Sequence, residues 1–250
     1  MDDLRLSLKD ALSLTDSLLA LVDRSLDRTS AVPTRDRCEV ILVAAYGRAY
    51  RCLRSIRETA ARGEADDATV LVRALVALIL RSLYIVQPEE QAERQRRLAQ
   101  WVGKSRRDQR VMIEELRELE YEFTDEDVDR ARELESATTW AGVLPSDKDL
   151  AKSVGLGQVY SHVYRLASDA AHYGIFTMLE GFEKQPETVT GEGASVSLVK
   201  SDPDRASDAL AYGVVSYGAF LEKSEPVIGH GVTSAASALV SAYFADSEGP

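Results

Sequence analysis

The stretch at residues 160–174, YSHVYRLASDAAHYG, contains two of the three histidines in the chain, with an arginine and an aspartate between them. Histidine exchanges protons near neutral pH, and arginine offers a charged fork that fits a phosphate. On a regular helix these four side chains would fall within an arc of about 80°. Such a stripe could cleave a phosphodiester without a metal, with histidine moving protons and arginine neutralising charge at phosphorus. The candidate catalytic residues are His162, Arg165, Asp169 and His172.

Asp169 comes one helical turn before His172, where it could orient the imidazole or raise its pKa. The opposite side of the same helix is apolar, and Phe176 ends the polar stripe. The alternative interpretation is a solvated helix face, or a face that hydrogen-bonds to a neighbouring helix, without chemistry. Both interpretations require one helix from about residue 157 to residue 182.

At these residues the sequence resembles the HEPN superfamily, small all-helical bacterial and archaeal domains whose motif is an arginine, four to six residues, and then a histidine. Arg165 and His172 match this spacing. The resemblance implies a bacterial, metal-independent endoribonuclease of the toxin or phage-defence type that acts on RNA as a homodimer. It also implies that Arg165 and His172 are the catalytic pair, with Asp169 and His162 as supports.

The sequence is also similar to uncharacterised bacterial helical families that carry an A-x-x-L-x-R helix, followed later by a ladder of tyrosine, serine and histidine. The matching residues here are Ala68, Leu71 and Arg73, and then Tyr164, Ser168 and His172.

A basic ridge is predicted in the segment AAYGRAYRCLRSIRE, where Arg48, Arg51 and Arg54 recur every three residues beside two tyrosines. Arginine and tyrosine together suit phosphate contact and base stacking, so these arginines are candidates for RNA or phosphate binding. The alternative is structural, because arginine is a good helix former and the ridge could pair with the acidic residues 111–135.

Arg73 and Arg81 interrupt the most apolar segment of the chain, VLVRALVALILRSLYIV. Buried arginines need partners, so we expect each to meet a carboxylate or a helix end. Alternatively, the two side chains line a polar cavity that binds an anionic ligand.

Helical periodicity runs through most of the sequence and predicts an all-α fold, a bundle of seven to nine helices that are mostly long and antiparallel. Capping residues and breakers place the expected helices at residues 4–26, from 34 or 36 to 61, 66–86, from 88, from 124, 157–182, 201–221 and 233–244.

Three segments follow from this pattern. Residues 1–183 form the helical core, and residues 184–204 form a polar linker or a small hairpin. Residues 205–250 form C-terminal helices, which we expect to pack on the same domain and to offer a surface to a protein partner.

The net charge of −11 argues against a general nucleic-acid coat or an anionic membrane as the partner. The acidic N-terminus lacks the features of a signal peptide. The longest aliphatic run, at residues 74–80, is shorter than the roughly 20 residues that span a bilayer. We therefore expect a cytoplasmic protein that does not contact a membrane.

The two cysteines, Cys38 and Cys52, fall on one expected helix, about 21 Å apart, which is too far for a disulfide. We expect them to be small buried hydrophobic residues. No set of residues has the spacing of metal ligands, a nucleotide loop or a nucleophile elbow, so neither a metal nor a cofactor is expected.

The leading hypothesis is therefore a HEPN-like endoribonuclease. The alternative is a non-catalytic helical interaction or regulatory module, which Leu166 favours, because active HEPN members commonly have Asn, Asp or His after the arginine. A ligand-sensing bundle built around Arg73 and Arg81 is a further alternative.

Overall fold

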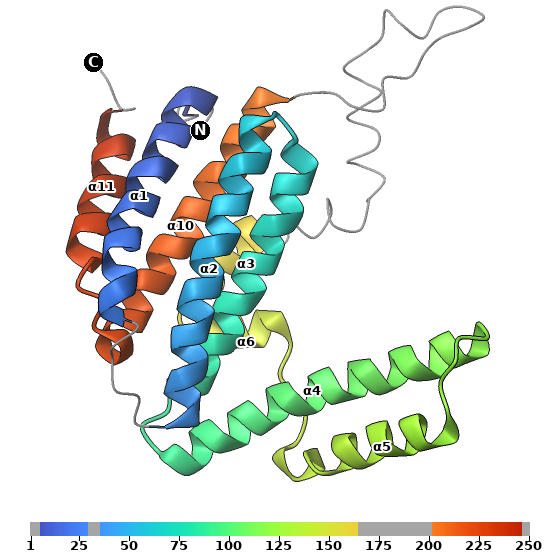
Figure 1. Cartoon of the computed structure of the whole chain (residues 1–250). Helices are drawn as coiled ribbons and strands as arrows, with labels where there is room; N and C mark the ends of the chain where they lie inside the picture. The colour runs from blue at the N-terminus through green and yellow to red at the C-terminus, as the bar shows by residue number, and fades with distance from the viewer. Residues whose placement is uncertain (1–5, 30–35, 165–201, 247–250) are drawn as a thin grey trace, which may run out of the picture.

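The computed structural model describes residues 6–29, 36–164 and 202–246. Within these ranges the chain forms nine α-helices, a short 3-10 helix and a short π-helix, with no strand (Figure 1). The predicted all-α class is therefore confirmed.

Four long helices lie side by side and form the main bundle (Figure 1). The helix α10 packs against the other three, and a fifth helix, α11, packs on α1 and α10. The bounds of these helices are α1 Leu8–Thr29, α2 Arg37–Ala61, α3 Ala65–Val86, α10 Pro203–Ile228 and α11 Thr233–Asp246. Helices α10 and α2 approach each other closely at Gly213 of α10, where an added Cβ would lie 3.1 Å from Leu53 Cδ1 of α2.

Helix α3 lies in the middle of this packing. It contacts α2 and α10 along the bundle, and twelve of its residues are buried. Among the described helices, it is the one that is long and apolar enough to cross a membrane, although its longest uninterrupted aliphatic run is short. A core helix passes the same criterion, and the burial of α3 in the bundle accounts for its composition.

The predicted helix starts agree with the capping contacts in two places. Asp36 caps α2, because its Oδ1 accepts hydrogen bonds from the backbone N–H groups of Cys38 at 2.7 Å and Glu39 at 2.9 Å. Thr124 and Asp127 form a capping box at the predicted start of a helix, α5 (Asp125–Ser136). The predicted end of α10 at Leu221 is too early, because Ser224 and Ile228 continue its buried face.

A helical arm leaves the bundle after α3 (Figure 1). It consists of α4 (Gln91–Glu118) and α5 (Asp125–Ser136), which pack together around a small apolar cluster of Ile113, Val128 and Ala131. The acidic residues of the arm pair with its own arginines. Arg110 binds both Glu114 and Glu135, Arg117 binds Asp125, and Arg132 binds Glu114 and Asp129.

The chain returns from the arm to α3 through short elements. These are the 3-10 helix η1 (Thr139–Ala141), α6 (Asp147–Ser153), α7 (Gly157–Val159) and the π-helix η2 (Tyr160–Tyr164). The expectation of a regular α-helix from residue 157 is therefore wrong over residues 160–164. A π-turn is wider than an α-turn, so the 80° arc estimated for a regular helix does not apply there.

The two cysteines are free, as predicted, with Cys38 buried and Cys52 partly buried. Burial and the neighbouring Asp36 carboxylate raise the pKa of the Cys38 thiol to about 11. Cys38 therefore behaves as a small apolar residue at neutral pH.

The third histidine of the chain, His230, is a fully buried structural residue in the turn between α10 and α11. Its Nδ1 lies 2.6 Å from Oε2 of Glu225, its Nε2 lies 3.0 Å from the carbonyl oxygen of Leu221, and its ring stacks on Tyr46 of α2. Burial lowers the pKa of His230, while the Glu225 carboxylate and the Leu221 carbonyl oppose this shift. The histidine links the C-terminal helices to α2.

Candidate functional site

The predicted catalytic residues Arg165, Asp169 and His172 lie outside the described residues. The backbone of His162 belongs to the π-helix η2, but its side chain also lies outside the description. The described structure therefore reaches only the residues that lead into Arg165, and the catalytic residues stay a prediction.

The described residues before Arg165 end in two buried side chains. Val163 and Tyr164, the last residues of η2, are 3% and 8% exposed, and η2 packs against α3 and α6. The residue next to Arg165 in the sequence is thus fixed in the core of the protein.

A charged cluster surrounds Tyr164. Its hydroxyl donates a hydrogen bond of 2.5 Å to Oδ2 of Asp147, the first residue of α6. Oδ1 of the same carboxylate lies 3.4 Å from Nη2 of Arg81. The guanidinium carbon of Arg73 lies 5.6 Å from the centre of the Tyr164 ring, which suits a cation–π contact. We call Arg73, Arg81, Asp147 and Tyr164 the Tyr164 cluster.

The Tyr164 cluster combines two arginines with one carboxylate. In the described part of the chain, Asp147 is the one carboxylate that forms an ion pair with either arginine. Arg81 Nε is buried without a hydrogen-bond partner among the described residues. The cluster therefore carries excess positive charge and a spare donor, a combination that favours an anion nearby.

The tyrosine of the cluster stays protonated at physiological pH. Burial raises the pKa of the Tyr164 hydroxyl above its usual value, and its hydrogen bond to Asp147 raises it further, while Arg73 opposes the shift. Tyr160 stacks on Tyr164, with ring centres 5.0 Å apart, and holds the phenol ring in place. The hydroxyl acts as a hydrogen-bond donor and not as a base.

The prediction for the α3 arginines is met by Arg81, which has a carboxylate partner at the start of a helix. Arg73 faces an aromatic ring instead. Sequence analysis missed Asp147 and Tyr160. The signal for Asp147 was the need of an arginine on an apolar helix for a carboxylate, but nothing in the local sequence distinguishes Asp147 from the many other acidic residues.

The α2 arginines lie elsewhere on the surface. Arg48, Arg51 and Arg54 are exposed, and Arg54 lies 3.8 Å from Glu58 on its own helix. The next arginine of the ridge, Arg57, forms a two-pronged ion pair with Asp16 of α1. Among the described residues, the ion-pair partners of the ridge thus come from α1 and α2, and not from the acidic residues 111–135 as the structural alternative supposed.

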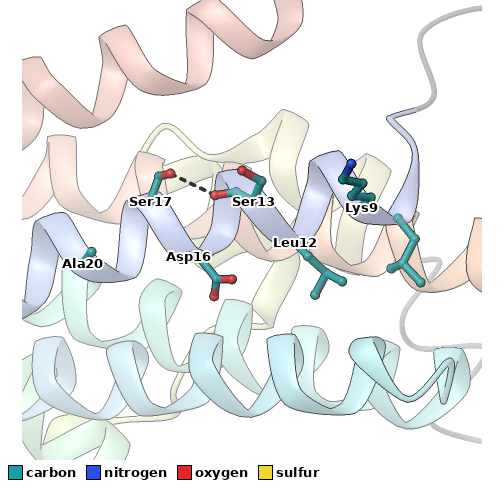
Figure 2. Close-up of a pocket in the computed structure, with 7 residues that line it drawn as sticks. Lys9, Leu12, Ser13, Asp16, Ser17 and Ala20 are labelled. Atoms are coloured by element: carbon teal, nitrogen blue, oxygen red, sulfur yellow. Dashed lines mark hydrogen bonds between the residues drawn. The ribbon is translucent and has the colours of Figure 1, made fainter.

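A shallow hollow on the outer face of α1 is a weaker candidate (Figure 2). Its lining combines apolar and small side chains with one lysine and one aspartate, and Ser17 donates a hydrogen bond to the carbonyl of Ser13. No charged groups converge there. The described residues contain no group of three histidine, cysteine, aspartate or glutamate side chains that could hold a metal ion.

Comparison with known proteins identifies one family. A model described as a family of unknown function, DUF5677, matches residues 39–187. No curated protein and no solved structure matches the chain. The matched range contains the Tyr164 cluster, the arm and the Arg165–His172 motif, whereas α1, α10 and α11 lie outside it.

The Tyr164 cluster can be tested by removing one oxygen atom. Tyr164→Phe should lower the free energy of unfolding by about 1.5–3 kcal/mol, because the hydrogen bond to the partly buried Asp147 carboxylate is lost. Chemical denaturation followed by circular dichroism measures this change.

The matched control is Tyr160→Phe. The Tyr160 hydroxyl has no hydrogen bond to a described residue, and the variant keeps the ring that stacks on Tyr164. Equal stability losses in the two variants would show that the hydroxyl of Tyr164 has no special role.

Proposed function

Since the chain belongs to DUF5677, a family of unknown function, we propose a function from its own residues: a HEPN-like, metal-independent endoribonuclease. Arg165 binds the scissile phosphate and His172 is the acid–base residue, with Asp169 and His162 as supports. The observation that best supports this proposal is the Tyr164 cluster, which anchors the residue next to Arg165 and concentrates positive charge around it.

The chemistry requires one bond to form and one to break. A 2′-hydroxyl of RNA loses its proton and its oxygen attacks the adjacent phosphorus, which breaks the bond from phosphorus to the 5′-oxygen of the next nucleotide. That oxygen gains a proton as it leaves, and the other product end is a 2′,3′-cyclic phosphate. Histidine suits both proton transfers, and arginine suits the negative charge that develops on the phosphoryl oxygens.

The Tyr164 cluster supports this proposal in two ways. An acid–base site needs rigid supports, because small displacements of the reacting groups reduce the rate steeply. Val163 and Tyr164 are buried directly before the motif, and Asp147 ties Tyr164 to α6. The two arginines of α3 also attract a polyanion towards this end of the motif.

Arg48, Arg51 and Arg54 extend the proposal to RNA binding. Their side chains are exposed on α2, where they can contact phosphates of a bound strand. Such contacts add affinity without sequence preference and weaken as the salt concentration rises.

Incubation of the purified protein with total RNA in EDTA tests the catalytic pair. We expect cleavage by the native protein, and a rate lower by about 100-fold or more in His172→Ala and in Arg165→Ala, because acid–base catalysis contributes at least that factor. Circular dichroism checks that each variant is folded.

The control is Arg62→Ala, which removes an exposed arginine whose partner is its neighbour Glu64. This variant should cleave RNA at the native rate. Cleavage that survives His172→Ala would exclude the proposed mechanism.

A second candidate function is anion sensing at the Tyr164 cluster. Arg81 Nε favours it, since this donor has no hydrogen-bond partner among the described residues and a ligand oxygen would satisfy it. In this function the site binds a small anionic metabolite and no RNA is cleaved.

Thermal unfolding in inorganic phosphate, compared with chloride at equal ionic strength, tests this candidate. A ligand that binds only the folded protein raises the melting temperature, so phosphate should raise it for the native chain and for Arg62→Ala, but not for Arg73→Ala. The same increase in Arg73→Ala would place phosphate at another site.

A further inference from the structure

Helix α4 carries a seam of four apolar and two polar residues along the arm. Six residues of this helix and its C-cap are separated alternately by three and four positions, which is the spacing of a coiled-coil interface. We call these residues the α4 seam: Val102, Ser105, Gln109, Met112, Leu116 and Leu119.

Three of the four apolar residues of the α4 seam are exposed to solvent, although an interface would bury them. Val102, Met112 and Leu119 are 38%, 51% and 69% exposed, although each is a large apolar side chain. Helix α5 covers a different side of α4, through the cluster around Ile113. Large exposed apolar residues at regular helical spacing indicate a binding surface.

The charges of the arm indicate what binds there. Residues 91–108, in the first part of α4, contain six basic residues and two carboxylates, whereas residues 109–126, which span the end of α4 and the tip of the arm, contain seven carboxylates and two arginines. Two such arms side by side in parallel would bring like charges together. In the antiparallel orientation, the basic part of each α4 faces the acidic helix end and tip of the other arm.

We propose that α4 pairs in an antiparallel coiled coil with α4 of a second copy of this chain. The seam residues then form complete layers around a twofold axis between positions 110 and 111. Val102 of one copy packs against Leu119 of the other, Ser105 against Leu116, and Gln109 against Met112. Every seam residue finds a partner in this register, as an isologous interface requires.

The base of the arm fits the tip of the second copy. A groove of about 510 Å³ opens there, between the start of α2 and α4, and its lining includes Arg37, Leu98 and Val102. In the proposed register this groove receives the tip of the partner arm, where Leu119 is 69% and Tyr121 61% exposed. Arg37 then faces the acidic residues of the tip. The second copy thus buries apolar residues at both ends of the arm.

The mass of the full chain in solution tests the proposal. Light scattering after size exclusion should give twice the chain mass of 27.5 kDa for the native protein and the single mass for Met112→Glu. Val215→Glu is the control, because Val215 is an exposed valine on α10, far along the chain from the seam, and this variant should remain a dimer. Leu119→Glu provides a second seam variant.

The orientation is tested by mixing two variants that each add one cysteine, Val102→Cys and Leu119→Cys, under mild oxidation. The antiparallel register predicts a disulfide between the two variants, whereas a parallel pair would link each variant to itself. The native thiols give little background because Cys38 is buried and the pKa values of both are raised.

Three results would overturn the proposal: a monomeric native chain, a dimer that persists in folded Met112→Glu and Leu119→Glu, or disulfides that form only within each cysteine variant. Either of the first two results would mean that the α4 seam binds a different protein or has no partner. These outcomes do not depend on whether the protein cleaves RNA.

Discussion

Two arginines on the most buried helix constrain the rest of the fold. Helix α3 must be surrounded because it is apolar on nearly every side, yet it carries Arg73 and Arg81, whose charges cannot be removed by deprotonation. The chain supplies Asp147 and Tyr164 to these arginines from the segment that returns from the arm. The route of residues 137–164, and the position at which the chain enters the Arg165–His172 motif, follow from this requirement.

The structure divides into a bundle and an arm that differ in what stabilises them. The bundle buries an extensive apolar core formed by α1, α2, α3 and α10. The arm has only a small apolar cluster, and arginine–carboxylate pairs cover much of its surface. Surface ion pairs contribute little to stability, so the exposed apolar residues of the arm are more informative about its role than its many charges. A binding function of the arm would explain why large apolar residues are exposed on its surface.

Local patterns predicted the helices well. The capping roles of Asp36 and Thr124 could be predicted because a cap depends on residues two or three positions away. The π-helix at residues 160–164 could not, since apolar periodicity cannot distinguish a wide turn from a regular one. The pairing of Arg81 with Asp147 joins residues 66 positions apart, so the sequence could predict the need for a carboxylate but not which one supplied it. The candidate catalytic residues after Tyr164 remain a prediction from sequence.

We propose that the chain holds an acid–base pair, anchored by the Tyr164 cluster, that cleaves RNA without a metal. The most direct measurement is the chemistry of the RNA ends produced in EDTA, determined by mass spectrometry of the fragments. We expect 2′,3′-cyclic phosphate and 5′-hydroxyl ends, because the nucleophile is the 2′-oxygen of the RNA itself. Fragments with 3′-hydroxyl and 5′-phosphate ends, or no fragments at all, would contradict it.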